Sequence, residues 1–209
     1  MIKDGGRQPA INKRKWGNVR ALTYYVGMSL DGFIAAPDGS IDTFPVTEDV
    51  MEFIAASYPE TLPTPVREQL GLTAPGTHFD TVVMGRNTYT PALEAGIRSP
   101  YAHLDQYVVS TTLPASPDPQ PHVVPGDPVG LVRRLKHQPG AGVWLAGGGR
   151  LAGALLGEID GLVIKRYPVV LGVGIPASMT DRSYLLSFEL VDDLTLPGGT
   201  TVTTYTRRS

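Results

Sequence analysis

Three consecutive glycines at residues 147–149 follow an apolar run at residues 143–146 and precede a helical pattern at residues 151–156. An apolar run of this length that ends in glycine is typical of a buried strand. A strand, a tight turn and a helix in succession form the repeating unit of parallel α/β sheets. This unit restricts the chain to folds in which a mostly buried sheet carries helices on its faces.

The chain from residue 20 onward alternates apolar runs with amphipathic stretches, which predicts a mixed sheet in an α/β domain. We expect strands at residues 22–28, 81–84, 107–110, 122–124, 143–146 and 162–167. We expect one helix at residues 47–58 and a short one that is capped by Asn87 or Thr88. We expect a third helix at residues 128–137, capped by Asp127, and a fourth directly after the three glycines. Residues 29–45 and 59–76 should be loops, the first of them mobile, and residues 184–191 and 201–205 should form a closing antiparallel hairpin.

Composition narrows the class of protein further. The 209 residues, 42% of them hydrophobic, can bury one core. Cysteine is absent, so disulfides and thiolate zinc sites are excluded, and we expect no metal and a cytoplasmic location. We expect a basic tail at residues 1–19 and one domain at residues 20–209. We expect the tail to be solvated or docked on a partner rather than bound to nucleic acid, and no membrane association, because no run is apolar enough to span a bilayer.

Two elements indicate phosphate binding at the carboxyl ends of expected strands, where open α/β sheets bind ligands. At the glycine turn the backbone can approach a pyrophosphate, although close packing of the next helix would also require glycine. The turn is not the dinucleotide fingerprint G-x-G-x-x-G, because Gly153 comes one residue late. Arg86 offers a charged fork and Thr88 a hydroxyl, which together suit a phosphate monoester such as the 2'-phosphate of NADPH. Alternatively, Arg86 is a surface arginine beside a helix cap.

A third polar element, Ser110, Thr111 and Thr112, follows the expected strand at residues 107–110. Its hydroxyls could bond the same phosphate or the adenosine, but Ser and Thr at strand ends also serve as turn formers.

Five motifs in this order resemble the dihydrofolate reductase-like fold, and more narrowly its riboflavin-biosynthesis reductase branch. They are MSLDGFIA at 28–35, VMGRNTY at 83–89, VVSTT at 108–112, WLAGGGRL at 144–151 and PVVLGVGIP at 168–176. The resemblance extends over about residues 20–208. It implies a three-layer α/β fold with a mixed, mainly parallel central sheet, helices on both faces and a C-terminal antiparallel hairpin. It also implies NADPH as the cofactor and a homodimer.

The resemblance further implies which residues hold the cofactor. Gly85, Arg86 and Thr88 would bind the 2'-phosphate, with Ser110 and Thr111 near the adenosine. The pyrophosphate and the nicotinamide ribose would lie on Gly147, Gly148, Gly149, Arg150 and Leu151. The nicotinamide would be lined by Gly27, Ile34 and Ala35.

Hydride transfer also needs a dry substrate pocket and commonly a nearby proton donor. Our candidates for a catalytic acid are Asp49 and Asp31. Asp49 lies one helical turn before Phe53, about where folate reductases carry their pterin-binding carboxylate, although a first-turn acid also favours the helix dipole by itself. The expected substrate-binding residues are Ser29, Asp49, Phe53 and Lys165, the last of which could meet a substrate phosphate.

These features predict an NADPH-dependent reductase. Its partner would be a small-molecule substrate, either a small polar heterocycle or a carbonyl compound. Dihydrofolate is disfavoured, since residues 104–106 lack the arginine that folate reductases use, and Ala152 and Lys165 stand where those enzymes carry an aromatic residue and a threonine. Dihydrofolate reductase, a non-catalytic nucleotide-binding protein on the same fold and an unrelated α/β module remain as alternatives.

Overall fold

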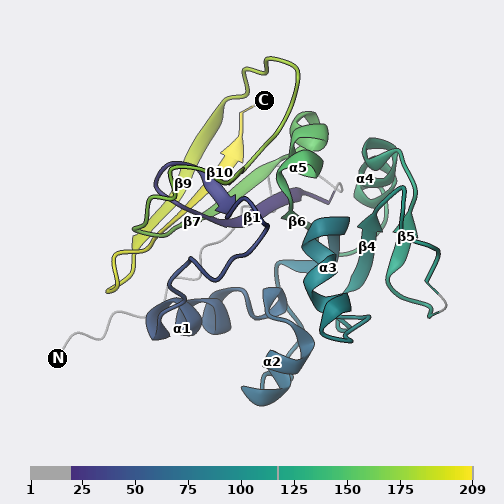
Figure 1. Cartoon of the computed structure of the whole chain (residues 1–209), viewed down its shortest axis with the longest axis horizontal. Coiled ribbons are helices and arrows are strands. Elements are labelled where there is room, and N and C mark those ends of the chain that lie inside the picture. The colour runs from purple at the N-terminus through teal and green to yellow at the C-terminus, as the bar shows by residue number, and fades with distance from the viewer. Residues whose placement is uncertain (1–19, 117, 209) are drawn as a thin grey trace.

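This computed structural model describes residues 20–116 and 118–208. An eight-stranded sheet forms the centre of this part of the chain (Figure 1). The expected basic tail at residues 1–19 lies outside the described residues. The strand order is β5-β4-β3-β6-β1-β7-β10-β9. The strands are β1 (Leu22–Met28), β3 (Phe79–Gly85), β4 (Asp105–Val109), β5 (His122–Val124), β6 (Gly142–Gly147), β7 (Gly161–Arg166), β9 (Phe188–Thr195) and β10 (Thr201–Arg207).

The sheet is mixed and mainly parallel, as predicted. Strands β5, β4, β3, β6, β1 and β7 run parallel to one another, and β7 pairs antiparallel with β10. Strands β10 and β9 pair antiparallel at one edge, which confirms the closing hairpin. Because the six parallel strands point the same way, their carboxyl ends share one edge of the sheet.

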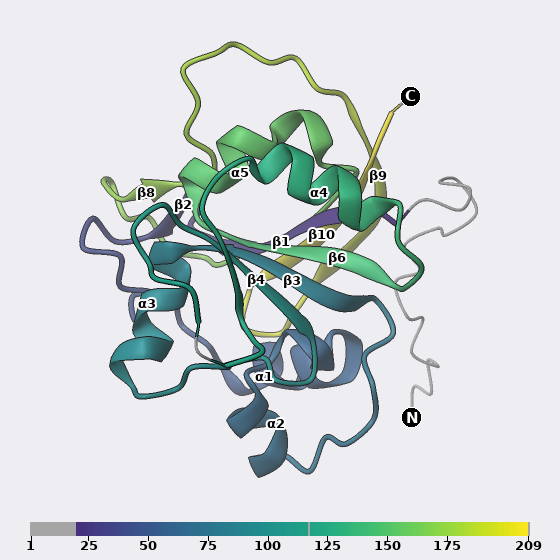
Figure 2. The same cartoon turned by 90° about the vertical axis from the view of Figure 1, so that its right-hand side faces the viewer.

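Helices cover both faces, which confirms the three-layer architecture (Figure 2). Helices α1 (Glu48–Ser57), α2 (Thr64–Gln69) and α3 (Arg86–Glu94) lie on one face, and α4 (Pro128–Lys136) and α5 (Gly149–Leu155) lie on the other. Two apolar clusters correspond to these layers. Val50 and Tyr89 pack with Met84 and Trp144 in the first cluster, and Leu135 packs with other residues of the second.

The helix starts agree with the sequence in one case and not in another. Asp127 accepts a hydrogen bond from the backbone N–H of Gly130 over 2.8 Å, so the predicted cap of α4 is confirmed. The predicted cap of α3 at Asn87 or Thr88 is wrong, because β3 runs to Gly85 and the helix begins directly at Arg86 without a side-chain cap.

Two segments predicted as loops contain regular structure. Strand β2 (Phe33–Ala35) pairs antiparallel with β8 (Ile175–Pro176) in a separate two-stranded sheet. The segment at residues 59–76 holds the 3₁₀ helix η2 (Pro59–Thr61) and helix α2. Proline in the first turn of a helix loses no hydrogen bond, so the prolines that suggested a loop are compatible with both helices. In the described part of the chain no helix is long and apolar enough to cross a membrane.

Candidate functional site

The central strands β1 and β6 stop pairing before they end. Their register runs from Leu22 opposite Val143 to Tyr24 opposite Leu145, yet β1 continues to Met28 and β6 to Gly147. The chain also changes direction here, since it leaves β1 toward β3 and later passes from β6 across β1 to β7. Ligands of open α/β sheets bind outside the carboxyl ends of the strands at such a switch point.

The glycine turn and the end of β3 meet beside this point. Met84 of β3 is in register with Gly147, which has a φ of 121° that glycine adopts readily. A Cβ atom built on Gly148 would lie 3.6 Å from Oγ1 of Thr88, and one on Gly85 would lie 3.7 Å from the Gly147 carbonyl oxygen. Two motifs about sixty residues apart in sequence therefore form one surface.

The guanidinium of Arg86 reaches the segment that follows β4. Its Nη1 donates to Oγ1 of Thr112 over 2.6 Å, and both groups are exposed. The Ser110 hydroxyl is buried and accepts from the backbone N–H groups of Thr112 and Leu113 at 3.2 and 3.0 Å. Ser110 thus shapes the turn, while Thr112, a member of the third polar element of the sequence, provides the hydroxyl beside the arginine. Thr111 is exposed next to them.

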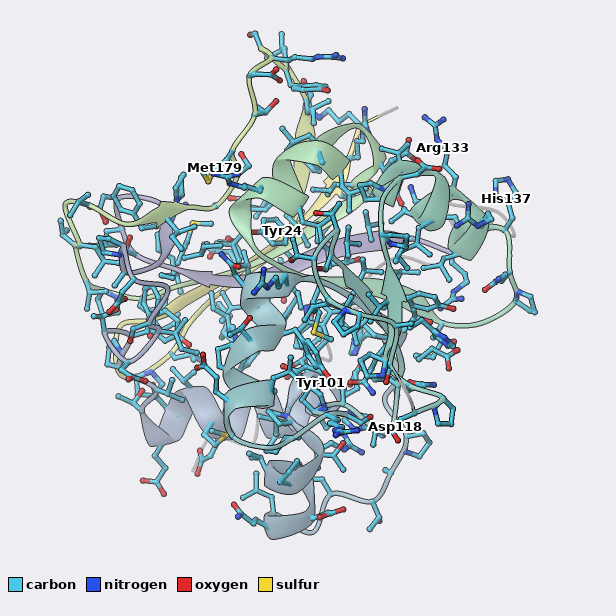
Figure 3. The ribbon with its side chains drawn as sticks, turned by 45° about the vertical axis from the view of Figure 1, so that its right-hand side comes forward. Tyr24, Tyr101, Asp118, Arg133, His137 and Met179 are labelled. Atoms are coloured by element: carbon cyan, nitrogen blue, oxygen red, sulfur yellow. The ribbon has the colours of Figure 1, made fainter. Side chains whose placement is uncertain are left out.

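The third glycine of the turn is required for packing. A Cβ atom on Gly149 would collide with the carbonyl oxygen of Pro176, and one on Gly153 with the carbonyl oxygen of Met179. The backbone N–H of Met179 donates to the Gly149 carbonyl oxygen over 2.8 Å, and Figure 3 shows Met179 beside α5. A Cβ atom on Gly147 or Gly148 would meet no backbone atom and only Oγ1 of Thr88, at 3.8 and 3.6 Å. Arg150 follows as an exposed side chain.

Asp31 joins two loops at the edge of the site. Its carboxylate accepts hydrogen bonds from the backbone N–H groups of Leu171 and Gly172 at 3.2 and 2.8 Å. The hydrogen bond from Ser29 is the main reason that the pKa of this carboxyl lies below its usual value, and the two backbone bonds add to it. The Ser29 side chain is fully buried, and its hydroxyl accepts from the Phe33 backbone N–H. Ile34 and Ala35 follow in β2.

Asp49 is bonded to the hairpin at the sheet edge. Its carboxylate accepts from the Thr47 hydroxyl and, over 2.7 Å, from the backbone N–H of Gly198. The hydrogen bond from Thr47, then that from Gly198, lowers the pKa of this exposed carboxyl. Phe53, one turn later in α1, has its ring 6.0 Å from that of Tyr58. The catalytic roles that sequence assigned to Asp49 and Asp31 stay predictions, and both carboxylates already have backbone partners.

Lys165 stands in β7, in register with Gly27 of β1. Its side chain is partly buried rather than the exposed strand cation that we expected, and its Nζ lies 4.5 Å from the centre of the Tyr25 ring. Burial lowers the pKa of Lys165 to about 8. A Cβ atom on Gly27 would meet the Tyr167 ring at 2.8 Å, so glycine gives that ring room. Tyr25 and Tyr167 were not among the expected site residues, because tyrosines in apolar runs are commonly core residues.

Comparisons with known proteins give a matching family and a relative of similar sequence. The sequence profile described as the RibD C-terminal domain matches residues 20–202. The uncharacterized protein YwjB of Bacillus subtilis (strain 168) is 30% identical over 159 residues, which cover 75% of this chain and 82% of YwjB.

Two solved structures are similar in fold. A candidate riboflavin biosynthesis protein from Shewanella sp. PV-4 matches with a TM-score of 0.63 and 27% identity, over 90% of this chain and 99% of that one. A diaminohydroxyphosphoribosylaminopyrimidine deaminase/5-amino-6-(5-phosphoribosylamino)uracil reductase from Thermotoga maritima matches with a TM-score of 0.60 and 14% identity, over 91% of this chain and 57% of that one. At this identity the second match supports the fold alone.

Proposed function

The chain belongs to the RibD C-terminal domain family, and from this premise we propose that it is an NADPH-dependent reductase of a small polar heterocycle or carbonyl compound. The observation that carries the proposal is the register of Met84 with Gly147. It brings the Arg86 fork and the backbone of the glycine turn close together, as two phosphates of a single dinucleotide would require.

The residues on this surface fit NADPH in type as well as in position. Arg86 and Thr112, with Thr88 and Gly85 beside them, form a cationic, hydroxyl-rich corner suited to the 2'-phosphate. The remaining cofactor contacts are Ser110 and Thr111 for the adenosine, Gly147, Gly148, Gly149, Arg150 and Leu151 for the pyrophosphate and ribose, and Gly27, Ile34 and Ala35 for the nicotinamide. When bound, the reduced nicotinamide supplies the hydride, and the protein positions it and excludes water.

The substrate would lie on the face of the sheet that α1 covers. Phe53, Tyr25 and Tyr167 supply apolar walls there, and Lys165 supplies a cation. Asp49 and Ser29 complete the set of substrate-binding residues that the sequence suggested. A flat, polar and partly anionic acceptor suits a pocket with aromatic walls and one ammonium group. Reduction of a riboflavin precursor is one member of this class.

We also propose that the protein acts as a homodimer. In the described part of the chain β9 lies at one edge of the sheet, and its side chains Leu190, Val191 and Leu194 are 53%, 41% and 41% exposed. An edge strand with exposed apolar side chains is a surface that a second copy could cover. Light scattering during gel filtration should give twice the mass of the 22.4 kDa chain, and a monomer at micromolar concentration would contradict the dimer.

The deciding experiment combines cofactor titration with turnover. NADPH binding followed by its fluorescence should be at least about tenfold tighter than NADH binding, because only NADPH carries the phosphate that Arg86 recognises. NADPH oxidation should then be measured with 5-amino-6-(5-phosphoribosylamino)uracil, dihydrofolate and a panel of small aldehydes. NADPH binding without oxidation of any acceptor would favour the non-catalytic alternative, and equal or absent binding of both cofactors would overturn the proposal.

A further inference from the structure

Lys165 is a partly buried cation whose ammonium has no hydrogen-bond acceptor or carboxylate partner among residues 20–116 and 118–208. The described polar atoms that are both unpartnered and sealed from solvent are Tyr25 Oη, Tyr58 Oη, Glu60 Oε2 and Arg67 Nη1, so Nζ of Lys165 is not sealed in the same way. Removing a charge from water without a partner is costly. An unpartnered ammonium that is not sealed from solvent is therefore placed to interact with a ligand.

The groups around Lys165 are mostly neutral aromatic side chains. Tyr25 faces it from β1, with the Tyr58 ring 4.9 Å from that of Tyr25, and Val202 of β10 is its apolar neighbour on the other side. Burial raises the pKa of Tyr25, of Tyr58 to about 12, and of Tyr167, so these hydroxyls stay protonated and are weak acids. The aromatic face also stabilises the ammonium form against the cost of burial.

The other charged groups in this region act on the tyrosines and not on Lys165. Glu60 acts on the hydroxyls of Tyr25 and Tyr58, and Asp192 acts on that of Tyr58. The His78 ring packs against Tyr58 at 4.5 Å from its centre and pairs with Glu60. Neither carboxylate contributes to the pKa of Lys165, which burial alone lowers.

The two carboxyl groups that sequence favoured as acids are poorly suited to carry a proton at neutral pH. Asp49 and Asp31 each accept hydrogen bonds that stabilise the ionised form and lower the pKa. Lys165 has the opposite property, because it is mostly protonated at pH 7 and is a stronger acid than an ordinary lysine. Its register with Gly27, the expected neighbour of the nicotinamide, places it one strand away from the site of reduction.

We propose that Lys165 is the proton donor of the reduction. This inference rests on the proposed function. Bound NADPH supplies a hydride to the carbon of a C=N or C=O bond, and the electron pair of that double bond moves to the nitrogen or oxygen. An N–H bond of the Lys165 ammonium breaks, its proton bonds to this heteroatom, and the neutral amine regains a proton from water.

The first test needs no substrate and uses the full-length protein. Trace acetylation with acetic anhydride between pH 6 and pH 10, read by mass spectrometry, reports the titration of each lysine. Lys165 should become reactive around pH 8, well below its midpoint in the same protein unfolded in urea. A folded midpoint equal to the unfolded one, or no acetylation at any pH, would overturn the proposal whether or not NADPH binds, so its failure is distinct from that of the proposed function.

The second test uses variants with NADPH and 5-amino-6-(5-phosphoribosylamino)uracil, or the aldehyde of the panel that the wild type reduces fastest. Lys165→Met should lower kcat about 100-fold or more, keep NADPH affinity within about twofold and abolish the loss of activity above pH 8. Lys165→Arg keeps the charge but is too weak an acid, so KM should stay near that of the wild type while kcat remains low. Arg134→Gln, which removes an exposed cation from α4, is the control. Full activity of Lys165→Met, or rescue by arginine, would disprove the donor role.

Discussion

Nη1 of Arg86, the first residue of α3, donates to Oγ1 of Thr112 across 2.6 Å and so joins the ends of two neighbouring parallel strands. The contact holds an exposed guanidinium in place with its other N–H groups available. An arginine fixed in this way recognises a phosphate at a lower entropic cost than a free one, since fewer rotamers are lost on binding.

Replacing Arg86 should remove the preference between the two cofactors. Arg86→Ala should weaken NADPH binding about 10- to 100-fold, the equivalent of one lost charge-assisted contact, and leave NADH binding unchanged. Fluorescence titration with both cofactors measures the ratio. Arg98→Ala, which removes an exposed arginine paired with Asp118, is the matched control and should alter neither affinity. Loss of affinity for both cofactors to the same extent would contradict a role in phosphate recognition.

Gly153 of α5 and Gly157 of the 3₁₀ helix that follows it (Leu156–Glu158) should differ sharply in their tolerance of a methyl group. Gly153→Ala places Cβ against the carbonyl oxygen of Met179 and should destabilise the fold by about 1–3 kcal/mol, as overpacking does. Gly157→Ala meets no atom within 4 Å and should leave stability nearly unchanged. Thermal and urea unfolding of both variants measure the difference. Equal stabilities would show that the segment around Met179 can move away from α5.

Asp31 should control the order of the loop that follows β7. Asp31→Asn weakens the acceptor for the N–H groups of Leu171 and Gly172, so these amides should exchange with deuterium faster while β1 is unaffected. In the wild type the protection of these amides, which is the ratio of the intrinsic to the observed exchange rate at each pH, should fall as the pH falls through the lowered pKa of Asp31, because the ionised form makes the stronger bonds. Asp38→Asn, which changes only a local bond to Ser40, is the control. Unchanged exchange at Leu171 would exclude this link.

Glu60 should contribute stability that depends on pH. Its buried carboxylate accepts from the backbone N–H groups of His78 and Phe79 and pairs with the His78 ring. Burial opposes its ionisation, but the hydrogen bonds from His78 and the backbone outweigh this and lower the pKa. The stabilisation is therefore complete above the usual value of 4.5 and is lost as the pH falls through the lowered folded value.

Urea unfolding measures this contribution directly. Glu60→Ala should cost about 3 kcal/mol at pH 7 and progressively less as the pH falls through the lowered pKa of Glu60, where the wild type loses the ionised form. Glu68→Ala, an exposed acid of α2, should change stability by less than about 0.5 kcal/mol throughout this pH range. A cost for Glu60→Ala that does not vary with pH would show that packing, not charge, is what the side chain provides.

Much of the fold could be predicted from the sequence because the apolar runs are long and their boundaries are marked by glycine, proline and capping residues. Strands β1 and β5 have the predicted bounds, and Asp127 caps α4 as its position before Pro128 indicated. The small β2–β8 sheet could not be predicted, since each strand is too short to show a period and the partners are far apart in sequence. Helix α2 was missed because proline is read as a breaker, although the first helical turn accepts it.

The motifs expected to face the phosphates are visible in the sequence because backbone and arginine chemistry leave a signature there, and the fold brings them together at the ends of β3 and β6. Their contact with a cofactor stays a prediction. The surroundings of Lys165 could not be predicted, because they depend on which side chains a register brings together. Nothing near Lys165 in sequence indicates that its ammonium will lie over Tyr25. Thr112 and Thr111 are equally polar neighbours, and only the fold shows that Thr112 is the one that meets Arg86.

The point at which β1 and β6 stop pairing divides the sheet into two halves. Under the proposed function, the residues that would bind the nucleotide lie mainly in one half, after β3, β4 and β6, and those that would surround the acceptor lie in the other half, after β1 and β7 and in α1. Substitutions at Phe53 or in the loop after β7 would then change which acceptor a member of this family reduces and leave its cofactor binding unchanged. Divergence of acceptor choice among relatives should concentrate on that second half.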